Sequence, residues 1–381
     1  MRKTIKSYLN RTDLDKLQTP VFVYFPQQTK ENIRKFKKFE KNGIEVFYAI
    51  KANTYPDLVK QMVDAGFGFD VASKEEFTYL VDMGADPSKL SFSAPTKRSD
   101  DLTLAGKLGI PYYAFDSEEE VRKITRLIKD PTLFGRISTP SKESVFDLSS
   151  KFGMNDKYYE TILRKGKKEG WNIRGLTFHV GSQNVAITSW RDSMKKIEHL
   201  IDLSKSYGYD IDFLNLGGGI PAKYNGHSKD VEYYINGIIR LAKQLNHKYH
   251  FKKIIVEPGR AISADTTALV TEVINIKPYK KPPLIIVDSS IFGGLIEALE
   301  HFEYPIFTVD DLTNSGLQRK GKKYFRIGGY SCDGYDIINH KVLLPKEMAV
   351  GDKLVILYAG AYTSSCENFH MKPFPKIITA E

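Results

Sequence analysis

Glu45-Val-Phe-Tyr-Ala-Ile-Lys51-Ala-Asn53 is the stretch that decides how the first part of the chain folds. This apolar, aromatic and β-branched run predicts a buried strand, and Lys51 closes it. A charged amine at the end of a buried strand is costly unless it is paired, and a partly desolvated lysine is the type of amine that condenses with an aldehyde. A surface lysine at a strand end is the simpler interpretation. Lys51 therefore indicates chemistry only if other polar residues accompany it.

The composition is that of an ordinary globular protein. The chain has 381 residues, of which 41% are hydrophobic and 12% aromatic, enough for a large core or for two domains. No stretch approaches the roughly 18–20 continuous apolar residues of a membrane span, and the N-terminal residues contain no apolar secretory segment. We therefore expect a cytoplasmic protein without a membrane partner.

The cysteines and the charge limit the possible sites and partners. Two cysteines, Cys332 and Cys366, are too few for a disulfide framework or a four-ligand metal site, so we expect reduced thiols and no metal. The net charge of +10 would suit a nucleic-acid partner, but the basic clusters at 34–38, 164–168 and 319–323 are scattered along the chain. This scatter favours solvated lysine faces, and no nucleic-acid partner is expected.

Short strand-like runs alternate with helical stretches through the first two thirds of the chain. The runs lie at 21–25, 46–52, 68–71, 90–93, 112–115, 133–137, 176–179, 213–216 and 254–257. Ser73-Lys-Glu-Glu76 and Ser117-Glu-Glu-Glu120 have the pattern of capping boxes, which start helices. About eight such units over roughly 240 residues predict a (β/α)8 barrel, with a doubly wound sheet as the alternative.

After about residue 260 the pattern changes to strand-rich runs with few helical gaps. These runs lie at 268–276, 284–287, 324–327 and 353–358, with Pro- or Gly-containing breaks between some of them. The sequence therefore predicts an α/β fold with an N-terminal (β/α)8 barrel at 25–260. Residues 1–24 and 261–381 are predicted to form a C-terminal all-β domain.

Polar residues and glycines recur where the barrel runs end. They belong to six separate units: Lys51, Asp70, Arg136, His179, Gly217-Gly218-Gly219 and Glu257. In a barrel the catalytic groups come from the C-terminal ends of different strands. These positions would therefore converge on one mouth, as a small-molecule site requires.

Each of these positions also has a purely structural interpretation. The three glycines lack the spacing of a dinucleotide site, but successive backbone N–H groups after a strand can surround a phosphate; a tight turn would look the same. Glu257-Pro-Gly-Arg260 suits a protonated ring nitrogen on one side and a phosphate on the other, or simply forms a surface ion pair. His179 could equally be a core histidine.

Together these residues make the chain resemble, over nearly its whole length, the pyridoxal-phosphate-dependent decarboxylases of the alanine racemase-like fold. Eight motifs occur in that family's order: Tyr48-Ala-Ile-Lys51-Ala-Asn53, Gly68-Phe-Asp70-Val-Ala-Ser73-Lys-Glu-Glu76, Ser150-Lys-Phe-Gly153, His179-Val-Gly-Ser182, Gly217-Gly-Gly219, Glu257-Pro-Gly-Arg260, Cys332-Asp333-Gly334 and Gly360-Ala-Tyr362-Thr363. The family's barrel and β domain agree with the periodicity. The resemblance implies a carboxy-lyase that uses pyridoxal 5'-phosphate.

The resemblance also implies roles for the barrel residues. Lys51 would form the Schiff base with the cofactor, Glu257 would pair with the pyridine nitrogen, and His179 would stack on the ring. The phosphate cradle would consist of Ser182, Gly218, Gly219, Gly259, Arg260 and Tyr362. The residues that orient Lys51 and the ring would be Asp70, Glu76 and Arg136, although Ser73 and Glu76 also fit a helix cap.

Two residues of the C-terminal domain would complete the site. Cys332 is similar to the family cysteine that reprotonates the carbanion after CO2 leaves, so that Lys51, His179 and Cys332 would be the catalytic residues. Asp333 is similar to the carboxylate that receives the distal amine of the substrate. In this family both residues reach into the barrel of the other subunit, which implies a homodimer with shared active sites.

The Cys332-Asp333-Gly334 form resembles the ornithine, lysine and arginine decarboxylases. It implies a basic L-amino acid substrate, a di- or polyamine product and a place in polyamine biosynthesis. Asp333 and Glu300 are the candidate carboxylates for binding the substrate, although Glu297 and Glu300 could instead lie on a solvated helix face.

Other functions stay open at this stage. Gln183 is more typical of the diaminopimelate and arginine branches, so meso-diaminopimelate or a conjugated diamino acid is an alternative substrate. A racemase on the same barrel would be expected to carry an arginine in place of Glu257. A non-catalytic regulator should have lost Lys51, Cys332 or Asp333, and the chain has all three.

Overall fold

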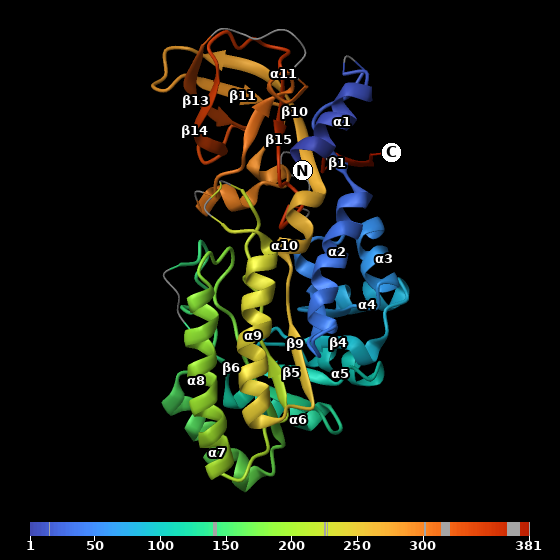
Figure 1. The fold of residues 1–381 in the computed structure, drawn as a ribbon, viewed down its shortest axis with the longest axis vertical. Helices are drawn as coiled ribbons and strands as arrows, with labels where there is room; N and C mark the ends of the chain where they lie inside the picture. The colour runs from blue at the N-terminus through green and yellow to red at the C-terminus, as the bar shows by residue number, and fades with distance from the viewer. Residues whose placement is uncertain are drawn as a thin grey trace. The chain divides into compact units, whose positions relative to one another are not determined.

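The computed structural model describes residues 1–14, 16–139, 143–224, 226, 228–300, 302–313, 321–363 and 374–380. The chain divides into two compact units (Figure 1). The barrel unit comprises Asn32–Pro221 and Lys229–Ala261, and the sheet unit comprises Met1–Glu31, Ala222–Ser228 and Ile262–Glu381.

The barrel unit contains a closed barrel of parallel strands. In order around the barrel these are β2 (Glu45–Ala49), β3 (Gly68–Val71), β4 (Leu90–Phe92), β5 (Tyr112–Phe115), β6 (Thr132–Ile137), β7 (Ile173–Phe178), β8 (Phe213–Asn215) and β9 (Lys253–Val256), and β9 pairs with β2. The predicted barrel is confirmed, and the doubly wound sheet is wrong because the strands close on themselves.

Helices follow the barrel strands and lie outside them. They are α3 (Pro56–Asp64), α4 (Lys74–Asp82), α5 (Ser99–Lys107), α6 (Glu118–Leu127), α7 (Asp156–Glu169), α8 (Ile187–Ser206) and α9 (Val231–Tyr249), with the short turns η1 (Ile50–Ala52) and η2 (Pro87–Lys89). Figure 1 shows α8 and α9 side by side. The helices α2 (Pro26–Glu40) and α10 (Arg260–Ser263) cross the unit boundaries in the sequence.

Alternating strand residues fill the barrel with aromatic and aliphatic side chains. Phe47, Ala114, Phe134, Phe213 and Ile255 form a buried cluster that comes from five different strands. Burying a side chain of the size of Phe or Ile stabilises the fold by about 1.5–3 kcal/mol. The cluster therefore supplies a rigid base on which the strand ends can hold polar residues.

The two predicted capping boxes both start helices, but their glutamate side chains make different contacts. Ser73 accepts a hydrogen bond from Glu76 N, and the Glu76 carboxylate accepts one from Ala72 N. Ser117 likewise accepts from Glu120 N at the start of α6. The carboxylate of Glu120 turns inward instead and binds a buried lysine, which is described below.

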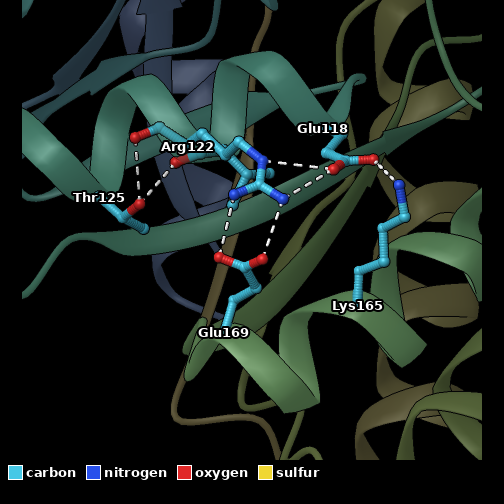
Figure 2. Close-up of polar contacts among 6 residues, drawn as sticks. Glu118, Arg122, Thr125, Lys165 and Glu169 are labelled. Carbon is cyan, nitrogen blue, oxygen red and sulfur yellow. Dashed lines mark hydrogen bonds and ion pairs between the residues drawn. The ribbon is translucent and has the colours of Figure 1, made fainter.

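An exposed ion-pair network connects α6 with α7 on the outside of the barrel (Figure 2). The guanidinium of Arg122 donates two hydrogen bonds to Glu169 and two to Glu118, and Lys165 also contacts Glu118. These cationic partners lower the pKa of Glu118. The planar guanidinium suits this two-sided arrangement, because its donors diverge in one plane.

The sheet unit is built mainly from strands. They are β1 (Val21–Tyr24), β10 (Thr267–Lys277), β11 (Leu284–Val287), β12 (Ile306–Thr308), β13 (Lys322–Gly328), β14 (Ile337–Pro345), β15 (Lys353–Ile356) and β16 (Lys376–Thr379). The order is β12-β15-β10-β11-β13-β14, and β1 joins β10 and β16. The first of the nine predicted runs therefore lies in this sheet, antiparallel to β10, which leaves eight runs for the barrel.

Short helical segments accompany this sheet. They are α1 (Arg2–Arg11), α11 (Val309–Thr313), η3 (Ala264–Thr266), η4 (Ile291–Gly293) and η5 (Ile296–Glu300). Ile5 and Leu9 of α1 pack in one buried cluster with Val23, Val270 and Val355 of the sheet. The predicted C-terminal β domain is thus confirmed as a mostly-β unit, and helices cover part of its sheet. Within the part of the chain that the structure describes, no helix is both long and apolar enough to span a membrane.

Candidate active site

Five of the residues predicted from strand ends line one cavity in the barrel unit. The cavity has a volume of about 620 Å³, and these five residues are Lys51, Asp70, Arg136, His179 and Glu257. Each belongs to a different strand or to the segment that follows it. The strand-end pattern thus correctly predicted that these five residues share a cavity. The sixth predicted position, Gly217-Gly218-Gly219, is not among the described residues that line it, and the catalytic roles of all six stay predictions.

Lys51 forms an ion pair with Asp70 at the cavity wall. The predicted strand was three residues too long, because β2 ends at Ala49 and Lys51 lies in the one-turn helix η1. This turn is closed by the hydrogen bond from Asn53 N to Ile50 O. The side chain of Asp70 is 3% exposed and that of Lys51 is 48% exposed, so a buried carboxylate holds an accessible amine.

Glu257 follows β9 and is only 8% exposed. Its Oε1 accepts hydrogen bonds from Ser93 Oγ at 2.7 Å and from Asn215 Nδ2 at 2.6 Å. Burial and the neighbouring Asp70 carboxylate raise the pKa of Glu257 to about 7, although Lys51 and the two hydrogen bonds oppose this rise. Glu257 is therefore a group that can hold or release a proton near neutral pH.

His179 follows β7 and is held by the backbone. Its Nδ1 accepts a hydrogen bond from Gly181 N at 3.0 Å, which leaves Nε2 to carry the proton of the neutral ring. Burial and the positive charges of Arg136 and Lys51 lower the pKa of His179 to about 3, so the imidazole is neutral. Arg136 stacks on the ring of Phe152, with its guanidinium carbon 4.8 Å from the ring centroid.

The three glycines form a turn that passes very close to His179. A Cβ atom at Gly218 would lie 2.6 Å from the carbonyl oxygen of Glu257 and 3.0 Å from His179 Nε2. Gly217 and Gly219 have φ angles of 63° and 106°, which favour glycine. Only glycines allow the backbone to come this close. The segment is therefore a tight turn, and a tight turn can also surround a phosphate with its backbone N–H groups.

Ser182 and Arg260 meet near the same turn. The Arg260 Nε and Nη2 atoms donate to Ser182 Oγ at 3.2 and 3.1 Å, and Asn184 N donates to Gly219 O at 2.9 Å. A guanidinium, a hydroxyl group and a glycine turn are the donors that a phosphate requires. With the paired amine of Lys51 and the carboxylate of Glu257, this donor set fits pyridoxal phosphate.

Four other predicted site residues belong to the sheet unit. Cys332 and Asp333 are exposed in the segment between β13 and β14, where Asp333 Oδ1 accepts from Tyr335 N at 2.8 Å. Glu300 is exposed at the end of η5, and Tyr362 has a φ angle of 57°. Their functions stay predictions. Cys366 lies outside the described residues.

The strand-end pattern did not identify several residues of the cavity, although Lys151 and Phe152 belong to the motif Ser150-Lys-Phe-Gly153. Ser93, Lys151, Phe152 and Thr177 also line it. Ser93 ends its strand-like run as Lys51 ends another, and this position was a signal that could have identified it.

A buried ion pair lies directly after the cavity segment that contains Ser93. Lys97 has a fully buried side chain and donates to Glu120 Oε1 at 3.1 Å and to Ala114 O at 2.6 Å. Burial lowers the pKa of Lys97 to about 8, although Glu120 opposes this shift. The pair explains why Glu120 does not close its capping box, and it anchors the end of the segment that forms the cavity wall.

Comparisons with known proteins agree with this geometry. Residues 27–264 match the pyridoxal binding domain of the pyridoxal-dependent decarboxylases. The chain is 28% identical to the lysine/ornithine decarboxylase of Selenomonas ruminantium, over 93% of this chain and 87% of that protein.

Two solved structures have the same fold over essentially the whole chain. The arginine decarboxylase of Paramecium bursaria Chlorella virus bound to agmatine superimposes with a TM-score of 0.88, at 25% identity and with 100% of both chains covered. The Selenomonas ruminantium lysine decarboxylase in complex with PLP and cadaverine gives a TM-score of 0.84, at 26% identity, with 100% of this chain and 93% of that chain covered.

Proposed function

Because the chain belongs to the pyridoxal-dependent decarboxylases, we propose that it removes the α-carboxylate of a basic L-amino acid, of the ornithine, lysine or arginine type. Pyridoxal phosphate is the cofactor, and a di- or polyamine is the product. The observation that carries the proposal is the shared cavity in which the Lys51–Asp70 pair and Glu257 both lie.

The candidate active site would hold the cofactor at three points. Lys51 would bind its carbonyl carbon, and Asp70 keeps the amine in place. Ser182, Arg260 and the glycine turn would bind its phosphate. Glu257 would face its ring nitrogen. When bound, pyridoxal phosphate supplies an electron sink for the electrons of the broken Cα–carboxylate bond.

The electrostatics of the cavity favour a protonated ring nitrogen. A carboxylate at Glu257 would stabilise the positive nitrogen, and the neutral imidazole of His179 can stack on the ring without repelling that charge. An arginine at position 257 would have the opposite effect, so Glu257 supports decarboxylation over racemisation.

The carboxylate of Asp333 is the proposed partner of the substrate's distal amine. An ammonium group facing a carboxylate in a desolvated site makes a strong, charge-assisted contact. The similar proteins named above act on lysine, ornithine or arginine, which all carry a distal cation. Glu300 would add to this contact, and Cys332 would return a proton to Cα after CO2 leaves.

A CO2-release assay with several amino acids tests the function. We expect turnover of ornithine, lysine or arginine. Turnover should be much slower for the alternative substrates, meso-diaminopimelate and carboxynorspermidine, of which the latter represents the conjugated diamino acids. In diaminopimelate a carboxylate accompanies the distal amine and would repel Asp333. Failure to release CO2 from any of the three basic amino acids would contradict the proposal.

The Asp333→Ala variant tests the substrate contact. Loss of a charge-assisted hydrogen bond costs about 1.5–3 kcal/mol, so we expect kcat/KM for the preferred substrate to fall roughly 10- to 150-fold. Asp311→Ala is the matched control, because it removes a carboxylate of the same unit that pairs with Lys322. If Asp333→Ala kept the wild-type kcat/KM, Asp333 would not bind the distal amine.

We also propose a homodimer whose active sites combine Lys51 of one subunit with Cys332 of the other. The exposure of Cys332 and Asp333 supports this arrangement. The Lys51→Ala and Cys332→Ala proteins should each have little activity. If the two proteins exchange subunits at random, half of the dimers are mixed, and each mixed dimer contains one intact site out of two. One quarter of all sites are then intact, so activity should return to about one quarter of the wild-type value. A mixture that stays as inactive as its two components, after subunit exchange has been verified by mass spectrometry, would contradict shared sites.

A further inference from the structure

Two neutral side chains hold a single oxygen of Glu257. Ser93 Oγ lies 2.7 Å and Asn215 Nδ2 lies 2.6 Å from Oε1. They approach Glu257 from opposite sides around the barrel. Glu257 follows β9, Asn215 ends the neighbouring strand β8, and Ser93 follows β4, which lies beyond β2 and β3 on the other side. Asn215 is fully buried, so it is available to Glu257 and not to solvent.

The direction of these hydrogen bonds is determined by a second layer of contacts. Asn215 Oδ1 accepts from Gly217 N at 2.8 Å, so the amide must present its Nδ2 donor to Glu257. Ser93 Oγ also lies 2.9 Å from Ser91 Oγ, whose side chain is buried. A serine has one hydroxyl proton, so Ser93 can donate to Glu257 while Ser91 donates to Ser93.

This arrangement makes the two oxygens of Glu257 unequal. Oε1 already accepts two hydrogen bonds, so a proton on the carboxyl group resides on Oε2. No residue in the described parts of the chain donates a hydrogen bond to Oε2, and Glu257 lines the cavity. Oε2 is therefore the oxygen available to a bound ring nitrogen.

We propose that Ser93 and Asn215 are positioning residues that hold Oε1 of Glu257 and direct Oε2 at the ring nitrogen of the cofactor. This inference rests on the proposed function of the cavity. It assigns no chemical step to Ser93 or Asn215. They act through Glu257, which they orient and whose ionised form they favour.

The pKa of Glu257 depends on the charged groups around it and on its two hydrogen bonds. Asp70 opposes ionisation of Glu257, and Lys51 and Arg136 favour it. The hydrogen bonds from Ser93 and Asn215 also favour the ionised form. Removal of the Ser93 hydroxyl group therefore raises the pKa of Glu257, and a higher pH is needed before the carboxylate is present.

Ser93→Ala in the cofactor-loaded protein tests the proposal. The absorbance of the bound cofactor is titrated from about pH 5 to about pH 9. The midpoint of this titration should lie roughly half to one pH unit higher in the variant than in the wild type, because the protonation of the ring nitrogen follows that of Glu257. The acidic limb of the kcat profile should move by the same amount, with KM nearly unchanged. Ser93→Thr keeps the hydroxyl group and should restore both curves.

Ser204→Ala is the matched control for a purely structural role. Ser204 is a fully buried serine of the same unit whose hydroxyl group bonds to Leu200 O and lies 2.9 Å from the hydroxyl oxygen of Tyr159. Loss of the Ser204 hydroxyl group should lower the thermal stability of the protein. It should leave the midpoint of the cofactor titration at its wild-type value. The proposal is overturned if Ser93→Ala titrates like the wild type, or if Ser204→Ala shifts as much as Ser93→Ala does.

Asn215→Ala provides a second arm. It removes the shorter of the two hydrogen bonds and should shift the titration at least as far as Ser93→Ala does; an unchanged titration would contradict its role. The absorbance titration does not depend on turnover. If the protein released no CO2 from any basic amino acid, the proposed function would be contradicted. The absorbance titration would still test whether Ser93 and Asn215 position Glu257.

Discussion

The Lys51→Ala protein should release no measurable CO2 from the substrate that the wild type prefers. Lys51 is the accessible amine of the cavity, and loss of a covalent catalytic group typically costs about 10⁴-fold or more in rate. The wild type should be yellow, and borohydride should fix the cofactor on a peptide that contains Lys51. The variant should show neither property. A borohydride adduct at another lysine would contradict the assignment.

Two further variants separate amine chemistry from charge. Lys51→Arg keeps a positive charge opposite Asp70 but has no primary amine, so it should be as inactive as Lys51→Ala. Lys60→Ala is the matched control, because Lys60 also pairs with an aspartate, Asp64, but does so on the exposed surface of α3. It should keep wild-type turnover. Substantial activity of Lys51→Arg would reduce Lys51 to an electrostatic role.

Glu257→Gln should lower kcat by about 10²–10³-fold, which corresponds to about 2.7–4 kcal/mol of lost transition-state stabilisation. The amide has nearly the same shape as the carboxyl group but cannot stabilise a protonated ring nitrogen by its charge. Glu45→Gln is the matched control, since Glu45 begins β2 and pairs with Lys253. Equal activities of the two variants would contradict the role of Glu257.

The same variant makes a prediction for the protein without cofactor. The folded protein keeps a proton on Glu257 up to about pH 7, whereas the unfolded chain releases it near the ordinary value of 4.5. The contribution of Glu257 to stability is therefore complete below about pH 4.5 and is lost as the pH rises through about 7. Glutamine does not ionise. The Tm of Glu257→Gln minus that of the wild type should thus be higher at about pH 8 than at about pH 5, and a pH-independent difference would contradict the raised pKa.

Local sequence signals were sufficient to predict the barrel. Buried parallel strands appear as short apolar runs, and the serine caps at Ser73 and Ser117 mark where helices begin after them. β14 was missed because three consecutive polar residues interrupt Ile337–Pro345, and its pairing with β13 contains register shifts. An irregular antiparallel strand leaves no clean alternation in the sequence.

Strand ends also revealed much of the site. A polar residue that closes an apolar run is unusual in sequence, and in a barrel all such residues lie at one mouth. This rule alone predicts that Lys51, Asp70, Arg136, His179 and Glu257 are neighbours, and all five line one cavity. Ser93 followed the same rule but was missed, since a serine after a strand is a common residue in a turn.

Residue order and periodicity were enough to predict the barrel, five of the residues at its mouth and the family resemblance. The contacts that hold those residues come from the folded chain: Asp70 pairs with Lys51, and Ser93 and Asn215 both bind one oxygen of Glu257. The physical reason is that hydrogen bonds and pKa shifts depend on distances of a few ångströms between segments far apart in the chain. Ser93 and Glu257 are 164 residues apart in sequence, and closure of the barrel brings them together.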